Sequence, residues 1–541
     1  MSFPFKSWSH VLKAGQPFRA LMMGGAALVM AGGLSGCMVG PKYRKPDLWS
    51  PTQYNTHAQG GQAHSQTTSD APDPAWWNIF RDPELTSLET RLASENLDVR
   101  KAAAQLAQSR AQLLMAGAER FPGLSASGSY TRSQYSTKEL QYIIHRVGRQ
   151  VGNQINPQTG ELLSNEAGNA TVPLLNQWKD SIDATYEVDL WGRVARQYEA
   201  AKADLDASDE ARRGVLIAQQ ADMARDYTML RGLQEQLRIT QANRQIQAST
   251  LSLAQDRFHG GLVTDLDVQS AQAQVESTTA QIAQLQQRID QQINAISLLL
   301  GSPPGTLNDE LNRGAGIPVV PPRVPVGVPS ELAQRRPDIR QAEAQLHAAV
   351  ANVAEAEAEF YPKVTISADF GFQSLSIRDM GFWNARAWNV GPSISLPIFQ
   401  GGRLRGQLQL NRFAQKEAAI SYQQTVLGAW RDVDNALIAY RDEQQRHDGL
   451  ASAVAANQKA VSLAQDQYRH GLVTYLNVLS AQGNLQSAQL QLADSTTTLA
   501  GNLVQLYNAL GGGWETTFPI DNPARSSAEQ LAQAQPAGSV H

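Results

Sequence analysis

The strongest constraint on this chain is that it contains nearly the same segment twice. HGGLVTDLDVQSAQ begins at His259 and RHGLVTYLNVLSAQ begins at Arg469, so the offset is 469 − 259 = 210 residues. Between residues 253–272 and 463–482, 13 of 20 positions are identical without a gap. A match of this quality at a fixed offset indicates an internal duplication, and we expect the chain to fold as two similar units.

The duplication covers most of the chain. The offset of 210 also pairs Gly192 with Gly402, whereas an offset of 240 pairs Pro122 with Pro362. The first copy therefore has 240 − 210 = 30 additional residues between Pro122 and Gly192, which we expect to form an exposed outer loop. The resulting organisation is repeat 1 over residues 76–301, a proline-rich inter-repeat linker over 302–327, and repeat 2 over 328–514.

Both repeats predict the same elements in the same order. An Ala- and Gln-rich helical stretch ends before a proline, because the residue before a proline disfavours the helical conformation. Two alternating stretches follow, then a very long helical stretch without proline, the GLVT turn and a last helix. The predicted fold class is mainly α with four β-strands per chain. The helical ranges are 85–120, 194–258 and 266–300 in repeat 1, and 331–360, 404–469 and 476–510 in repeat 2.

The first residues indicate export and lipidation. Residues 1–36 have basic residues, then a short apolar run and small residues, which is the layout of a secretory signal peptide. Their removal changes the net charge from −4 to −4 − 3 = −7. Leu34-Ser35-Gly36-Cys37 resembles a bacterial lipobox, so Cys37 is the expected site of a covalent lipid anchor, with an incidental free thiol as the alternative. We expect residues 37–75 to be a lipidated linker, with 50–72 poorly ordered, and 515–541 to be a low-complexity tail.

The alternating stretches predict membrane strands. In SIDATYEVDL, which begins at Ser181, apolar and polar residues alternate, and a period of two places them on opposite faces of a strand. A half-buried sheet of a soluble protein shows the same alternation. The segment lengths, close to the 9–11 residues that span a membrane, and the aromatic residues at their ends favour the membrane. The acids on the polar face would line a lumen; they are Asp183, Glu187, Asp189 and Asp369.

Four strands per chain cannot close a barrel. An open sheet edge in lipid leaves backbone groups unpaired at several kcal/mol each, so we expect the chain to borrow strands from copies of itself. Three copies give 3 × 4 = 12 strands, an even number in the range of bacterial barrels. The predicted assembly is a homotrimer in contact with outer membrane lipids.

The helices predict a hollow cylinder. Val268, Val275, Ile282, Ile289 and Ile296 are seven residues apart, as are their counterparts from Val478 to Leu506, and this spacing is typical of coiled coils. Residues 194–258 would form a helix roughly 100 Å long at about 1.5 Å per residue. Such a helix suits the wall of a hollow cylinder, with apolar seams between neighbouring helices and polar residues facing inward and outward.

The repeated GLVT segment lies where each long helix must reverse. A glycine takes the left-handed conformation that ends a helix at little cost, and a threonine suits the cap of the next helix. We therefore expect two hairpin tips per chain. They consist of Gly261, Leu262, Val263 and Thr264, and of Gly471, Leu472, Val473 and Thr474.

Several segments together resemble one known family. CMVGPKYRKPD after the lipobox, WWNIFRDPEL at residues 76–85, the Phe-Pro and Tyr-Pro helix exits and the paired GLVT turns resemble the TolC-like outer membrane factors, in particular the NodT-type efflux lipoproteins. The resemblance implies a trimer with a 12-stranded β-barrel continued by an α-helical barrel. It also implies a periplasmic adaptor that contacts the tips and an inner-membrane efflux transporter. By the same resemblance, Asp265, Asp267, Tyr468, Asn477 and Ser480 lie at the periplasmic aperture, where Asp267 and Tyr468 help to hold the tip closed.

Other function classes find little support in the sequence. There is no nucleophile with a nearby base, no phosphate-binding glycine loop and no metal-binding motif, so an enzyme is not expected. The acidic net charge gives no reason to expect a nucleic acid partner, and no cofactor is expected apart from the lipid on Cys37. The alternative to an efflux channel is a lipid-anchored periplasmic coiled-coil scaffold or adaptor without a pore.

Overall fold

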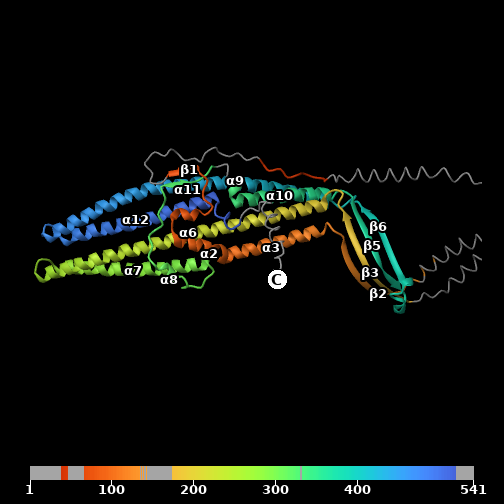
Figure 1. Cartoon of the computed structure of the whole chain (residues 1–541), viewed down its shortest axis with the longest axis horizontal. Coiled ribbons are helices and arrows are strands. Elements are labelled where there is room, and N and C mark those ends of the chain that lie inside the picture. The colour runs from red at the N-terminus through yellow and green to blue at the C-terminus, as the bar shows by residue number, and fades with distance from the viewer. Residues whose placement is uncertain are drawn as a thin grey trace, which may run out of the picture. The chain divides into compact units, whose positions relative to one another are not determined.

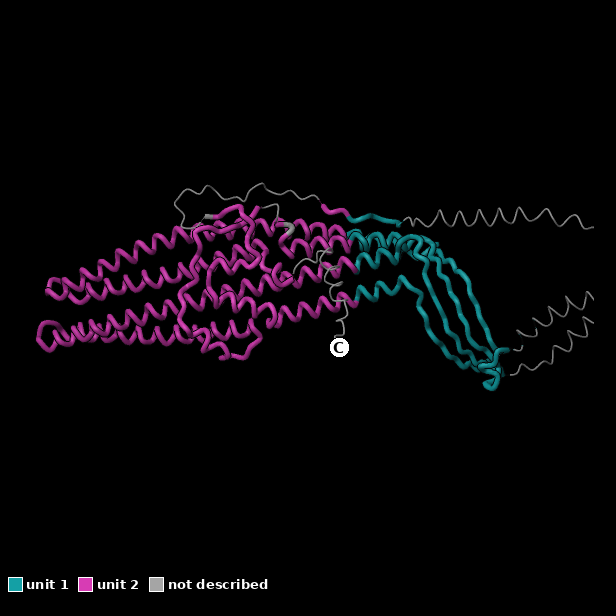
Figure 2. Tube along the Cα trace, viewed as in Figure 1, with its two compact units in different colours: residues 1–43, 112–201, 350–413 teal, residues 44–111, 202–349, 414–541 magenta. Residues whose placement is uncertain are grey.

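The computed structural model describes residues 38–46, 66–134, 136, 138, 142, 174–328 and 332–518. The expected signal peptide and Cys37, and most of the extra residues of repeat 1, lie outside these ranges. The chain divides into two compact units (Figure 2). Unit 1 contains residues 112–201 and 350–413 with the segment up to Tyr43, and unit 2 contains residues 44–111, 202–349 and 414–541. Each unit therefore contains parts of both repeats.

The two repeats have matching elements (Figure 1). In each repeat a helix leads into two strands, a very long helix and a final helix. The long helices α6 and α11 have 67 residues each, and their bounds differ by 210 at both ends. Repeat 1 contains α3 (Leu97–Ala118), β2 (Gly123–Ser133), β3 (Leu175–Val188), α6 (Arg193–His259) and α7 (Asp265–Leu299); repeat 2 contains α10 (Pro337–Ala358), β5 (Lys363–Ser374), β6 (Arg386–Ser395), α11 (Arg403–Arg469) and α12 (Tyr475–Leu510).

The expected first helix of each repeat is interrupted, so its predicted bounds are wrong. In repeat 1 it divides into α2 (Pro83–Glu95) and α3, because Asn96 leaves the helix and its side chain accepts from the backbone N–H groups of Asp98 and Val99. In repeat 2 the short α9 (Leu332–Arg335) is separated from α10 by Arg336. A proline at the first position of α10 suits a helix start, since its missing N–H has no partner there.

Two segments expected to be disordered or unstructured are partly ordered. β1 (Gln66–Thr68) pairs in parallel with β4 (Arg323–Pro325) of the linker, which also holds α8 (Asn308–Leu311). Residues 515–518, placed in the low-complexity tail, follow the buried Trp514, and the Phe518 ring lies 3.9 Å from the Arg212 guanidinium carbon. The remaining tail, residues 519–541, lies outside the described residues. The minor elements are η1 (Trp76–Phe80), η4 (Ile377–Asp379) and η5 (Trp383–Ala385).

The heptad pattern of the final helices forms much of the core of unit 2. Val275, Ile289 and Ile296 are buried in α7, and Val478, Leu485, Leu499 and Leu506 are buried in α12, while Val268, Ile282 and Leu492 are half-buried. The seven-residue repeat thus identifies the packed face, as coiled-coil packing requires.

The seam between the two hairpins is more polar than expected. Buried amide and hydroxyl side chains of α6, and the exposed Gln281 of α7, hydrogen bond to α12. The donor–acceptor pairs are Gln247 Nε2 with Gln486 Oε1 (3.3 Å), Gln486 Nε2 with Gln281 Oε1 (3.3 Å), Gln482 Nε2 with Thr250 Oγ1 (3.2 Å), and Asn243 Nδ2 with Gln489 Oε1 (3.1 Å). Apolar seams alone do not describe this contact.

The four long strands form one antiparallel sheet in the order β2-β3-β5-β6. β3 of repeat 1 pairs with β5 of repeat 2, with Ile182 opposite Phe370. Among the described residues, the outer edges of β2 and β6 have no partner strand. The sheet is therefore open at both sides within one chain.

A buried carboxylate in α2 predicts how stability responds to pH. Glu89 is fully buried, its carboxylate oxygens have no hydrogen-bond partner among the described residues, and burial raises its pKa well above the ordinary 4.5. The folded state therefore holds the proton more tightly than the unfolded state, and the free energy of unfolding falls as the pH rises above about 4.5. We expect Glu89→Met to stabilise the protein by about 1–3 kcal/mol at pH 7.5, with a smaller gain at pH 4.5. Thermal unfolding at both pH values measures this.

The control is Glu95→Met, at an exposed position of the same helix. A stability gain for Glu89→Met that is the same at both pH values would show that the carboxylate is not the cause.

Candidate functional site: the two-faced sheet and the hairpin tips

The register gives the sheet one apolar and one polar face. Residues directly opposite each other in an antiparallel sheet point to the same side, and the alternation of each strand lines up across all four. One row, for example, contains Leu124, Ala184, Ala368 and Val390. Four polar residues near one end of the sheet, Arg132, Asn176, Asp180 and Arg386, share this side with the apolar residues Leu124, Ala126, Tyr130, Trp178, Ile182, Ala184, Tyr186, Val188, Val364, Ile366, Ala368, Phe370, Phe372, Trp388, Val390, Pro392 and Ile394.

No described residue covers much of this apolar face. Ile182 is 59 % exposed, Trp388 is 69 % exposed and Ile394 is 72 % exposed. Soluble monomers rarely expose contiguous apolar patches of this extent, and such patches mark contact with a membrane or a partner. An ordinary half-buried sheet would have its apolar side packed on a core, so the exposure argues against that alternative.

The opposite face contains Ser, Thr, Asp, Glu and Lys side chains. The Ser127 hydroxyl donates to Asp183 Oδ2 at 2.9 Å, and Asp369 lies directly opposite Asp183 in the register. Glu187 is bound by Arg193 at the start of α6, with 2.8 Å between Nε and Oε1. Asp183, Glu187 and Asp369 therefore lie on one face of the sheet, and their position in a lumen stays a prediction.

Asp189 does not belong to this group. β3 ends at Val188, and Asp189 Oδ2 accepts from the backbone N–H of Ala195 at 2.8 Å. Its carboxylate therefore caps the first turn of α6, where free N–H groups and the helix dipole favour a negative charge. The expectation that Asp189 is a strand acid is wrong.

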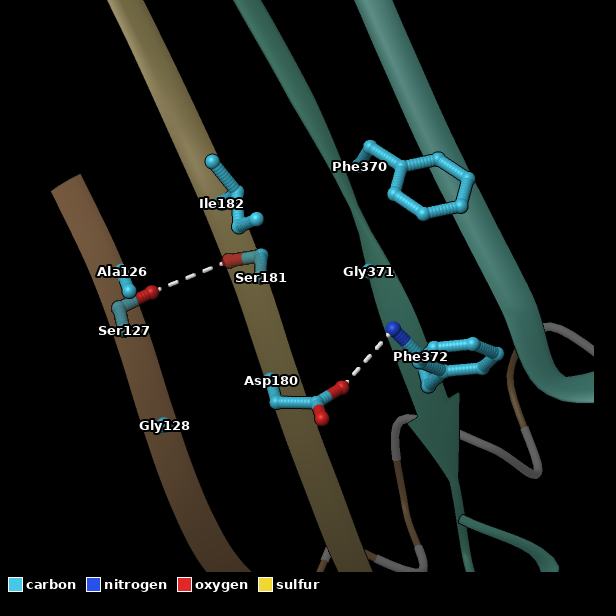
Figure 3. A pocket seen from close by; sticks show the side chains of 9 residues that line it. All are labelled: Ala126, Ser127, Gly128, Asp180, Ser181, Ile182, Phe370, Gly371 and Phe372. Carbon is cyan, nitrogen blue, oxygen red and sulfur yellow. Dashed lines mark hydrogen bonds between the residues drawn. The ribbon is translucent and has the colours of Figure 1, made fainter. Parts of the chain in front are cut away.

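A hollow of about 370 Å³ lies among β2, β3 and β5, lined by three consecutive residues from each strand (Figure 3). Beside it, the Asp180 carboxylate accepts from the backbone N–H of Phe372 at 2.9 Å. The backbones approach so closely here that a Cβ on Gly371 would lie 1.9 Å from the carbonyl oxygen of Asp180. Only glycine permits this approach. The lining residues are Ala126, Ser127, Gly128, Asp180, Ser181, Ile182, Phe370, Gly371 and Phe372.

Both GLVT segments form the expected helix reversal. Gly261 (φ +71°) and Gly471 (φ +72°) take the left-handed conformation. The N–H of Leu262 bonds to the carbonyl of Arg257, and the N–H of Gly261 to that of Phe258, which is the Schellman pattern of a helix end. Thr264 and Thr474 occupy the cap positions of α7 and α12, but their side chains make no capping hydrogen bond to the backbone. The Thr474 hydroxyl instead donates to Asn477 Oδ1 at 2.9 Å.

The tips present apolar side chains to solvent. Leu262 is 71 % exposed and Leu472 is 74 % exposed, whereas Val263 and Val473 are half-buried. The other predicted aperture residues Asp265, Asn477 and Ser480 are also exposed. The structure thus brings the predicted tip residues to the hairpin ends, with one exposed leucine in each turn.

The predicted pair of Asp267 and Tyr468 is not hydrogen bonded. The Tyr468 ring is buried, and no described residue hydrogen bonds to its hydroxyl. It packs in a cluster with Ala271, Tyr475 and Val478. Burial, the Tyr468 hydroxyl and the Asp267 carboxylate raise the pKa of Tyr475 to about 12. Asp267 therefore lies near Tyr475, and the sequence did not predict this tyrosine as part of the site.

Arg257 is a second tip residue that the sequence analysis missed. Its Nη1 donates to the carbonyl of Tyr468 at 2.8 Å, and its guanidinium carbon lies 4.7 Å from the centre of the Tyr468 ring. The contact joins α6 of repeat 1 to α11 of repeat 2. The difference between Arg257 and its repeat counterpart, Gln467, was the available sequence signal.

Within the described ranges, no cluster of His, Cys, Asp and Glu is arranged to hold a metal ion. In the same part of the chain, none of the helices has the length and apolar character needed to cross a membrane.

A family of known proteins has this combination of features. The family described as outer membrane efflux protein matches residues 89–302 and 328–512, that is, both repeats. The chain belongs to this family. It is 32 % identical over 503 residues to the solvent efflux pump outer membrane protein SrpC of Pseudomonas putida, covering 92 % of this chain and 99 % of SrpC. It is 31 % identical over 485 residues to nodulation protein T of Rhizobium leguminosarum bv. trifolii, covering 89 % and 95 %.

Solved structures share the fold of this outer membrane efflux protein. The outer-membrane channel OprN matches with a TM-score of 0.78 and 30 % identity, over 88 % of this chain and all of OprN (100 %). The MtrE outer membrane channel of Neisseria gonorrhoeae, in its open state, matches with a TM-score of 0.72 and 25 % identity, over 88 % and 99 %. The chain therefore has the fold of TolC-like outer membrane channels, with its sheet in the outer membrane and its long helices in the periplasm.

The close approach at Gly371 gives a testable consequence. We expect Gly371→Ala to separate β3 from β5 and to cost about 1–3 kcal/mol or more, as overpacking does. The amount of folded, heat-modifiable protein in outer membrane fractions should fall. The matched control is Gly391→Ala on β6, where an added Cβ meets no atom within 4 Å. Equal amounts of both variants would contradict the steric interpretation.

Proposed function

We propose that the protein is the passive exit duct of a tripartite efflux pump, and that three copies assemble around one water-filled channel. Family membership and the fold of outer membrane channels support the general role. SrpC is named as part of a solvent efflux pump, and a similar role here suits small molecules delivered by an inner-membrane transporter. The observation that carries the proposal is that, among the described residues, the four-stranded sheet has an unpaired strand edge on each side.

The sheet contains one junction between repeats, and its two outer strands, β2 and β6, each supply one side of a second junction. Within the chain, β3 of repeat 1 pairs with β5 of repeat 2. The counterpart of β3 in repeat 2 is β6, and the counterpart of β5 in repeat 1 is β2. If these counterparts pair in the same way, β6 of one copy pairs with β2 of the next. Ile182 lies opposite Phe370, so the counterparts Pro392 (182 + 210) and Tyr130 (370 − 240) would lie opposite each other. Both belong to the apolar face, so the two faces continue across the proposed junction.

The long helices show the same asymmetry: positions that are buried in α6 are exposed in α11. Glu210, Ile217 and Thr228 of α6 are buried, and Arg340 of α10 binds Glu210 at 2.6 Å. Their counterparts 210 residues later in α11 are apolar and exposed. These are Ile420 (64 % exposed), Leu427 (52 %) and Ile438 (43 %), and they form one stripe along the helix.

The helix that would cover this stripe has a complementary exposed face. α3 is the counterpart of α10, with an offset of 240. Leu114 on α3 is 76 % exposed, whereas its counterpart Ala354 on α10 is fully buried. The repeated relation therefore packs α11 of one copy against α3 of the next, with Ile420 beside Arg100, the counterparts of Glu210 and Arg340.

Three copies satisfy these junctions in a closed ring. They supply 12 strands from the 4-stranded sheet of each chain, a number within the range of bacterial barrels. The apolar face then contacts lipid, and Asp183, Glu187 and Asp369 face the lumen. A closed ring leaves no unpaired strand edge in the hydrocarbon.

The remaining parts of the proposal concern anchoring and partners. Cys37 carries a covalent lipid, which adds membrane affinity through its buried CH₂ groups. The exposed leucines at the tips bind a periplasmic adaptor protein through apolar contacts. No energy-transducing site is needed in the duct, because the inner-membrane transporter supplies the energy.

The alternative of a scaffold or adaptor without a pore remains less favoured. A periplasmic scaffold has no use for an apolar sheet face that is exposed on four adjacent strands. Such a scaffold would also not need a sheet with one apolar and one polar face, because its function would depend on the coiled coils alone.

The strand register between copies tests the assembly. Ser129 and Ser393 lie on the polar face, and the proposed junction places them directly opposite each other in adjacent copies. We expect Ser129→Cys with Ser393→Cys in one chain to form disulfide-linked trimers under mild oxidation, because directly opposite Cβ atoms are about 4.5–5.5 Å apart. Non-reducing electrophoresis of outer membrane fractions measures the crosslinked species.

The matched control is Ser125→Cys with Ser393→Cys, which is four residues, about 13 Å, out of register along β2. Crosslinking of the control but not of the first pair would overturn the proposed junction. The purified protein should also conduct ions in planar bilayers, and folded trimers without current would favour the scaffold.

A further inference from the structure

The hollow beside Gly371 opens on the apolar side of the sheet (Figure 3). The neighbouring side chains of the polar side, such as Lys179 and Asp183, do not line it. Its volume of about 370 Å³ lies within the range of small-molecule pockets. Because the sheet lies in the outer membrane, this side faces lipid. Six of the nine lining residues belong to this side: Ala126, Gly128, Asp180, Ile182, Phe370 and Phe372.

Two small residues of β2 leave the space for the hollow. Ala126 and Gly128 lie between the larger Leu124 and Tyr130 on the same side of the strand. A Cβ added to Gly128 would meet no atom of the chain within 4 Å, so a side chain or a ligand can enter the space. In repeat 2, the counterpart of Ala126 at the offset of 240 is Ile366. The repeated fold therefore does not require the hollow.

A carboxylate borders the hollow. Asp180 Oδ1 accepts from the backbone N–H of Phe372 at 2.9 Å, and no other described residue hydrogen bonds to this carboxylate. An ionisable group that faces lipid is costly and indicates a functional site. Its counterpart in repeat 2 is the apolar Val390. Since lipid tails supply no donor, a ligand with a hydroxyl or amide N–H group beside an acyl chain would offset this cost.

Two arginines lie on the same side of the sheet, towards its outer end. At this end the strands are joined to one another, whereas their other ends lead into the periplasmic helices. Arg132 is four residues, about 13 Å, beyond Gly128 along β2, and Arg386 begins β6. Both are exposed, and no described acid pairs with either of them. The Arg386 guanidinium carbon lies 4.6 Å from the centre of the exposed Trp383 ring. This rim therefore suits phosphate groups.

We propose that the apolar side of each sheet binds one phosphorylated glycolipid of the outer leaflet. One acyl chain fills the hollow, a lipid hydroxyl or amide N–H donates to Asp180, and lipid phosphates bind Arg132 and Arg386. The 13 Å or so from the hollow to Arg132 is within one leaflet, about 15 Å of hydrocarbon. In the proposed ring, Ile394 of the next copy lies opposite Gly128 and forms the remaining wall. The inference goes beyond the exit duct, since the site needs the membrane and not conduction.

Titration of purified, delipidated trimers with bisphosphorylated lipid A tests the hollow, with bound lipid counted by native mass spectrometry. We expect one tightly bound lipid per chain. Gly128→Leu fills the hollow and should weaken binding about tenfold or more, because the displaced CH₂ groups lose their burial. The matched control, Ala184→Leu, adds the same side chain to the same face outside the hollow and should stay within about twofold. Equal affinities of these two variants would overturn the site.

Dephosphorylated lipid A tests the arginines separately. Arg132→Ala and Arg386→Ala should each weaken binding of the phosphorylated lipid about tenfold and leave the dephosphorylated lipid within about twofold. Asp180→Val, which copies the other repeat, should weaken both lipids equally, because its partner is not the phosphate. Arginine variants that weaken both lipids equally would overturn the phosphate contacts. These variants decide the question even if Gly128→Leu does not assemble.

A phospholipid without sugar separates the glycolipid from anionic lipids in general. Phosphatidylglycerol should bind about tenfold more weakly than lipid A, and equal affinity would overturn the glycolipid assignment. Retained crosslinking between positions 129 and 393 shows that each variant is assembled. Trimers that bind lipid A as expected but never conduct would contradict the exit duct and leave the lipid site supported.

Discussion

Backbone hydrogen bonding at the sheet edges is the constraint on which the rest of the structure depends. An edge strand exposes N–H and C=O groups that water can satisfy, but hydrocarbon cannot. The sheet has edges at β2 and β6, and its exposed apolar face is suited to contact with lipid. One chain supplies too few strands to close on itself. Self-association is therefore a condition for a stable fold in the membrane, and the arrangement of the long helices follows from it.

The duplication explains why one contact between repeats is formed within the chain while the equivalent contact has no partner within it. A chain of two repeats contains the contact from repeat 1 to repeat 2, and lacks a partner for the contact from repeat 2 to repeat 1. The chemistry of the two contacts differs. The inner one includes the ion pair of the buried Glu210 with the half-buried Arg340, which favours one register and penalises others. At the matching positions of α11, isoleucine and leucine are exposed instead, and the proposed contact between copies would be favoured by burial of this apolar surface.

The sequence predicted those features that depend on local periodicity. Alternation gave the two faces of the sheet, and the offset of 210 gave α6 and α11 to within one residue. Features that depend on a single side chain or a distant partner were missed. Asn96 interrupts a helix whose composition continues unchanged, and Asp189 belongs by alternation to a strand but caps α6 instead. β1 pairs through its backbone with a segment more than 250 residues away, and Gln66–Thr68 carries no pattern that shows this.

The polar seam between the hairpins has a consequence for movement. Gln486 donates to Gln281 and accepts from Gln247, so one amide links α12 to both helices of the other hairpin. An amide has both donors and an acceptor, so a small displacement along the seam allows it to pair with another amide. An apolar seam has no such alternative, because displaced side chains leave cavities. The two ends of the seam have aromatic and cationic side chains instead of amides. At the tips Tyr468 packs with Arg257. Beyond the other end of α12, Trp514 lies near the guanidinium groups of Arg213 and Arg340. Displacement along the seam is therefore least costly in the amide-rich part between these clusters.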